Sequence, residues 1–151
     1  MNKRELVIFR KADLLASAIC DEKTYEHAKA VAEYVTSGSL RFLAMQMGLD
    51  LWVLKQVAFL HDALEDTDYK PGQQDTMPNV VWDSVKVLTK HKDESYEEYL
   101  IKIKRSLEQD KHTYAYPYLV KLADMKDHLN RKETLTDKLK EKYLNGLAIL
   151  L

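Results

Sequence analysis

The stretch VAFLHDALEDT, residues 57–67, joins an apolar run directly to a histidine and three carboxylates. The apolar run predicts a buried helix. Acidic side chains at the end of such a helix oppose its dipole, and they are costly to bury unless they have a partner. A divalent metal ion that acts on a phosphate would account for His61, Asp62, Glu65 and Asp66 together. For Glu65 and Asp66, a solvated acidic helix end is the alternative.

Helical periodicity continues through the rest of the chain. The first apolar stripe comprises Leu6, Phe9, Ala12, Ala16 and Ile19. The pattern predicts helices over about 6–19, 24–36, 40–47, 51–64, 79–89, 95–107, 117–129 and 135–150, with a loop over 66–78. Because strand-like alternation is absent, we expect an all-α fold in which residues 1–151 form a single domain.

Several residues mark where these helices begin and end. Gly38 is expected to stop one helix and Ser39 to cap the next, while Asp50 is expected to cap the apolar helix. Ser95 stands three residues before a glutamate, the spacing of a capping box. Pro117 suits the first turn of a helix.

Composition excludes several classes of function. The net charge of −1 provides no basic field to attract nucleic acid or a membrane surface. No apolar stretch approaches the roughly 20 residues of a membrane span, and the N-terminus does not read as a secretory signal. Cys20 is the single cysteine, so an internal disulfide is excluded. We therefore expect a cytoplasmic protein.

Four residues that can bind metals stand in apolar helical contexts: His27, His61, Asp62 and Asp124. A buried carboxylate such as Asp124 needs a partner. One divalent ion would satisfy two imidazoles and two carboxylates together, and this mixed set favours manganese, iron, cobalt or zinc over calcium. Each residue also has a simpler interpretation, His27 as a core histidine and Asp124 as the partner of Lys121.

Three segments then match a known family in order: HAKAVA at 27–32, HDALEDT at 61–67 and VKLAD at 120–124. Between the last two, VLTK at 87–90 and YEEY at 96–99 also match. On these segments the chain resembles the HD-domain metal-dependent phosphohydrolases, especially the small proteins related to the hydrolase half of the RelA/SpoT enzymes. The resemblance spans about residues 12–130.

The resemblance implies a helical HD domain in which His27, His61, Asp62 and Asp124 bind one divalent metal, usually manganese. It also implies that Glu65 and Asp66 act at the reacting phosphate. Their spacing agrees, because residues three and four apart share a helix face. One of the two could orient or deprotonate a water molecule.

The chain departs from the family pattern in two places. Close relatives carry an asparagine four residues after the aspartate of the third segment, where this chain has His128. His128 could donate a hydrogen bond to a substrate, coordinate the metal or block the site. The alarmone hydrolases also carry a longer basic segment upstream of their first histidine, where this chain offers only Lys23. We therefore assign substrate contacts to Lys23, Lys121 and His128.

The leading functional prediction is hydrolysis of a phosphorylated nucleotide, most simply a pyrophosphate ester of the (p)ppGpp type. Alternatives are a nucleotide monophosphatase or other phosphoester hydrolase, and a non-catalytic module that binds a nucleotide. A purely structural helical bundle is the third class, and it predicts no stoichiometric metal. The sequence does not indicate the oligomeric state.

Overall fold

In the computed structural model, which describes residues 12–151, every regular element is a helix, and the all-α prediction is confirmed for this part of the chain. Residues 12–19 are helical. The elements that follow are α2 (Glu22–Val35), α3 (Gly38–Gln46), α4 (Leu51–Leu60), α5 (Ala63–Asp66), α6 (Asn79–Val87), α7 (Tyr96–Gln109), α8 (Ala115–Asn130) and α9 (Asp137–Leu150). The expected apolar positions Leu6 and Phe9 lie outside the described residues.

Side-chain caps fix the start of four helices. Asp50 accepts hydrogen bonds from the backbone of Trp52 and Val53 at the start of α4. Ser95 accepts one from Glu98 at the start of α7. Asp21 and Thr136 cap α2 and α9 in the same way. The predicted caps at Asp50 and Ser95 are therefore confirmed, and each satisfies a backbone donor that has no partner within its helix.

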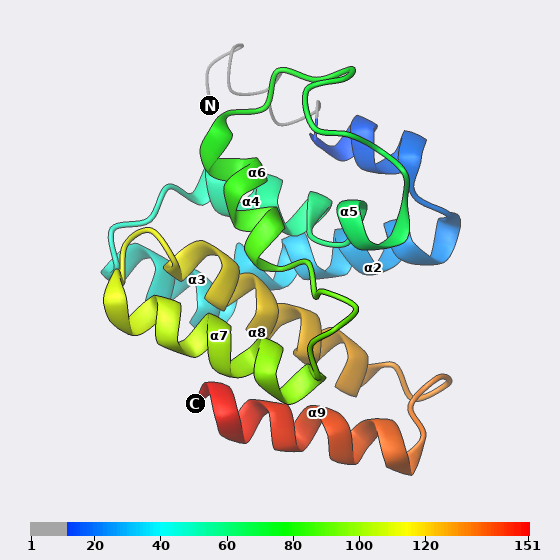
Figure 1. Cartoon of the computed structure of the whole chain (residues 1–151), viewed down its shortest axis with the longest axis vertical. Helices are drawn as coiled ribbons and strands as arrows, with labels where there is room; N and C mark the ends of the chain where they lie inside the picture. Colours follow the sequence, from blue (N-terminus) through cyan, green and yellow to red (C-terminus); the bar gives the residue numbers. More distant parts are fainter. Residues whose placement is uncertain (1–11) are drawn as a thin grey trace.

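Helix α4 lies at the centre of the molecule. Seven of its ten residues are buried, and it packs against α2, α6 and α8. A helix that is apolar on nearly all sides must be covered on all sides, which explains this position. Figure 1 shows α7, α8 and α9 gathered in one half of the molecule, with α9 running beside α7 and α8.

The predicted helix over 51–64 is interrupted at His61 and Asp62, two of the four predicted metal ligands. Helix α4 ends at Leu60, His61 is its C-cap, and Asp62 precedes the short helix α5. The ring Nδ1 of His61 lies 2.7 Å from the carbonyl oxygen of Ala58, which in a continuous helix would accept from the backbone of Asp62. Neighbouring residues of a continuous helix point about 100° apart. The break therefore lets both side chains face one point.

Two other boundaries differ from the prediction. Helix α3 begins at Gly38, after Ser37, so the expected cap Ser39 lies inside the helix. Gly38 has a φ of 55°, which suits glycine and allows the tight connection from α2. The loop between α5 and α6 forms as expected, and Asp75 orders it by accepting four hydrogen bonds. Within residues 12–151, none of the helices combines the length and hydrophobicity of a membrane span.

Candidate functional site

The structure brings together the four predicted metal ligands, which are separated by up to 97 positions in the sequence. His27 comes from α2, His61 and Asp62 from the break between α4 and α5, and Asp124 from α8. Each offers one donor atom, and these atoms all lie within 4.8 Å of one another. The four residues could hold a metal ion.

His27 is oriented by the carboxylate of Asp127, which was not among the predicted site residues. Its Nδ1 lies 2.5 Å from Oδ2 of Asp127, and its Nε2 lies 2.7 Å from Oδ1 of Asp124. Asp127 is buried, and it also accepts a hydrogen bond from Nε of Arg131 at 2.6 Å. A carboxylate on the far nitrogen of a histidine fixes the ring and makes the near nitrogen a better ligand. In the sequence, the position of Asp127 three residues after Asp124 indicates that the two carboxylates share a helix face.

His61 gives the clearest test of whether a cation fits here. Because its Nδ1 donates to the carbonyl of Ala58, the neutral ring carries a lone pair on Nε2. Nε2 is buried and makes no hydrogen bond to the residues that the structure describes. It lies 3.2 Å from Asp62 Oδ2 and 3.4 Å from Asp124 Oδ1. A lone pair that faces two carboxylate oxygens is repelled by them unless a proton or a metal ion lies between them, so the donor set fits a metal.

The ionisation of the site follows the same logic. Burial opposes charge on His61 and His27, but the neighbouring carboxylates outweigh it and raise the pKa of both imidazoles, that of His61 most. Burial likewise opposes charge on Asp124, yet Lys121 and the histidines hold the pKa of its carboxyl well below the usual range. The carboxylates therefore stay ionised and favour a nearby cation, which protons on the imidazoles or a divalent ion can supply.

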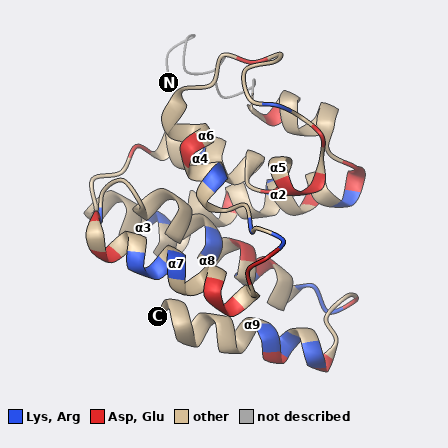
Figure 2. Cartoon of the chain, in the orientation of Figure 1, with Lys and Arg blue, Asp and Glu red and all other residues tan. Residues whose placement is uncertain are grey.

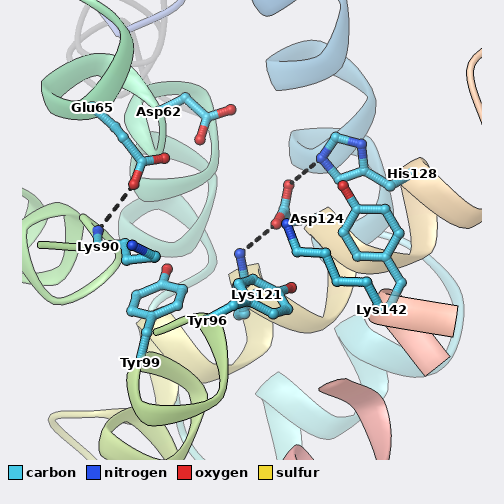
Figure 3. Close-up of a pocket in the computed structure, with 10 residues that line it drawn as sticks. Asp62, Glu65, Lys90, Tyr96, Tyr99, Lys121, Asp124, His128 and Lys142 are labelled. Carbon is cyan, nitrogen blue, oxygen red and sulfur yellow. Dashed lines mark hydrogen bonds and ion pairs between the residues drawn. The ribbon is translucent and has the colours of Figure 1, made fainter. Parts of the chain in front are cut away.

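A pocket with a volume of about 200 Å³ opens beside these ligands (Figure 3). Asp62, Glu65 and Asp124 contribute carboxylates to its lining. The remaining lining residues are basic or aromatic: Lys90, Lys121, Lys142, His128, Tyr96, Tyr99 and Tyr143. The pocket thus places the carboxylates of two candidate metal ligands, Asp62 and Asp124, near three lysines.

The two predicted catalytic carboxylates take different places. Glu65 lines the pocket, and its Oε1 accepts the backbone N–H of Lys90 at 3.0 Å. Asp66 is exposed and is not among the lining residues, although burial and the charges of Asp62 and Glu65 raise its pKa to about 6. Lys23, predicted as a substrate contact, is also exposed and outside the lining. Of the two predicted catalytic carboxylates, only Glu65 lines the pocket.

His128 is held from both sides. Its ring stacks on Tyr143 with centroids 4.9 Å apart, and it lies 4.4 Å from the ring of His27. Its Nε2 lies 3.2 Å from Oδ1 of Asp124. The ring therefore fills the space between the predicted metal ligands and α9.

No pattern in the sequence indicates that α9 contributes to the pocket. Lys142 and Tyr143 reach the pocket because α9 packs closely on α7 and α8 at Gly146. A Cβ atom at that position would lie 2.5 Å from Cε of Met125. Figure 2 shows the basic residues of α9 on its first half, the half that carries Lys142.

A scan against protein-family models finds no match for this chain, and a search of curated proteins finds no similar sequence. The functional assignment therefore depends on the geometry and chemistry of the site.

Proposed function

We propose that this chain is a metal-dependent phosphohydrolase of the HD type that acts on a phosphorylated nucleotide, with the pyrophosphate ester of (p)ppGpp as the first substrate to test. The observation that carries the proposal is the group of four candidate metal ligands, two of which, Asp62 and Asp124, line a pocket that is also lined by lysines. Manganese suits two imidazoles and two carboxylates, and it is the metal we propose.

The lining of the pocket supports a phosphate as the bound group. Lys90 and Lys142 supply ammonium groups, which bind phosphate oxygens as point charges. The volume of about 200 Å³ is below the roughly 300–1,000 Å³ of sites that enclose a drug-sized ligand. We therefore propose that the phosphoryl groups enter and that the nucleoside remains at the mouth.

When bound, the metal would polarise the phosphoryl group and lower the pKa of water. The chain itself supplies the base and the orientation. Glu65 is anchored through one oxygen by the backbone of Lys90, and it lines the pocket together with Asp62. From this position we propose that Glu65 accepts the proton of the attacking water, while Lys142 holds the phosphate.

The test is hydrolysis of a panel of phosphorylated nucleotides with manganese, (p)ppGpp included. Glu65→Gln keeps an oxygen that can accept from the backbone of Lys90, but it removes the base. Loss of a general base lowers kcat by about 10²–10⁴-fold. Glu108→Gln, an exposed residue outside the pocket lining, is the matched control and should retain full activity.

The result also separates the two remaining functions. Turnover of a nucleotide other than (p)ppGpp would retain the mechanism and replace the substrate. If manganese and nucleotides bind to wild type but no substrate turns over, the chain is a binding module. In that case Glu65→Gln should leave ligand affinity unchanged.

A further inference from the structure

Lys121 occupies a different position from the other pocket lysines. Its Nζ lies 2.8 Å from Oδ2 of Asp124, and its side chain is only 12% exposed. The ammonium group also lies over the rings of Tyr96 and Tyr99, 5.4 and 5.1 Å from their centroids. Figure 3 shows Lys121 pointing at Asp124 from the side opposite to His128.

The two oxygens of Asp124 therefore have different partners. Oδ1 faces the ring nitrogens of His27, His61 and His128, whereas Oδ2 is held by Lys121. A carboxylate whose second oxygen is bound by a buried ammonium group offers only its first oxygen to a metal. Lys142, in contrast, has its Nζ 4.3 Å from the ring centroid of Tyr96 and forms no ion pair with the four candidate ligands among residues 12–151.

We infer that Lys121 is a positioning residue that sets the coordination mode and the charge of the metal centre, and is not a substrate contact. The inference rests on the proposed metal site. Lys121 holds Oδ2 of Asp124, so a bound metal would be offered only Oδ1 and would keep a coordination position open. With a divalent ion bound, the two carboxylates would be neutralised, and Lys121 would leave the centre with a net positive charge, which would stabilise the charge that develops on the phosphoryl group during the reaction.

This role predicts that replacing Lys121 with an uncharged residue strengthens manganese binding. Removing a cation that borders the ion relieves charge repulsion and lets Asp124 bind through both oxygens. Manganese should therefore bind more tightly to Lys121→Met, by at least about tenfold, because Coulomb's law for a nearby charge at an effective dielectric constant of about 20 gives a repulsion above the roughly 1.4 kcal/mol of a tenfold change. The same variant should lose kcat with little change in KM, because the open position and the positive charge are lost.

The experiment measures the manganese Kd and the separate kcat and KM values for wild type, Lys121→Met, Lys121→Arg and Lys142→Met. Lys121→Arg keeps the charge and should approach wild type. Lys142→Met is the matched control, a pocket lysine over the same tyrosine, and it should raise KM with an unchanged Kd for manganese. If Lys121→Met does not fold without metal, Lys121→Gln removes the charge and retains a donor, and the same tighter binding is expected.

The outcomes are distinct. An unchanged or weaker manganese affinity in the uncharged variants, or a rise in KM alone, would overturn the inference and leave the proposed function intact. If wild type binds no divalent ion, the metal centre and this inference fail together. A merely structural lysine would weaken metal binding when it is replaced, which is the opposite of the expected result.

Discussion

Replacing Asp127 with alanine removes the group that orients His27. The carboxylate of Asp127 is buried, and it lies 2.5 Å from Nδ1 of that ring. Loss of such a partner behind a metal ligand typically weakens metal binding by about 10–100-fold, or roughly 1.4–2.8 kcal/mol. The released N–H of His27 is buried and would be unsatisfied, at a cost of about 1–3 kcal/mol of folding free energy.

Two measurements check this expectation, a manganese titration and a thermal melt. For a chain of this length, 1 kcal/mol corresponds to roughly 2–4 °C in Tm, so we expect a decrease of about 5 °C. Asp127→Asn keeps an acceptor for His27 without the charge and should give an intermediate Kd. Arg131→Met is the matched control, because it removes the other partner of Asp127 and leaves the contact with His27 in place. A folded Asp127→Ala that binds manganese within twofold of wild type would refute the reasoning.

Two further substitutions test the elements that frame the site. Gly146→Ala would place a methyl group 2.5 Å from Cε of Met125, so overpacking should lower the free energy of unfolding by about 1–2 kcal/mol. It should also raise KM by displacing Lys142, with an unchanged Kd for manganese. An unchanged KM would show that the neighbouring side chains accommodate the methyl group. Asp75→Asn should lower the unfolding free energy by about 2–3 kcal/mol at pH 7, because an amide cannot accept on both sides the four hydrogen bonds that Asp75 receives. Burial opposes its charge, but these donors, Trp82 among them, hold the pKa of Asp75 below its usual value, so its contribution is present above about pH 4 and is lost as the pH falls further. Denaturant unfolding at pH 7 and pH 3 should therefore show a difference from wild type that shrinks at the lower pH, and a constant difference would contradict this.

The helices and their caps could be predicted because they depend on local signals. Asp50 and Ser95 start their helices through bonds to backbone groups two or three residues away. The four residues that could hold a metal ion could also be predicted, since a polar group in an apolar helical stripe is visible in the sequence. Their convergence within 4.8 Å supports that reading.

The break after Leu60 could not be predicted from periodicity. The pattern of apolar residues continues through Leu64, and propensity favours one helix. A side-chain bond from His61 to the carbonyl of Ala58 ends the helical pattern. Such bonds compete with helical hydrogen bonds without any change in hydrophobic pattern.

The contribution of α9 to the pocket wall also could not be predicted from the sequence. Lys142 has the spacing of an ordinary solvent-facing lysine, and its place in the pocket depends on how α9 docks at Gly146. Lys121, by contrast, appeared in the sequence as a substrate contact or as a partner of Asp124. The structure shows the contact with Asp124 at 2.8 Å.

One face of α8 carries an ordered series of charges that explains how two buried carboxylates are tolerated. Lys121 pairs with Asp124, and Arg131 pairs with Asp127, at spacings of three and four residues. His27 lies between the two carboxylates and contacts both. The cation at one end draws negative charge away from the metal ligand, whereas the carboxylate of Asp127 adds negative charge through His27. Removing Lys121 should therefore tighten manganese binding and removing Asp127 should weaken it, two opposite shifts that a general loosening of α8 would not produce.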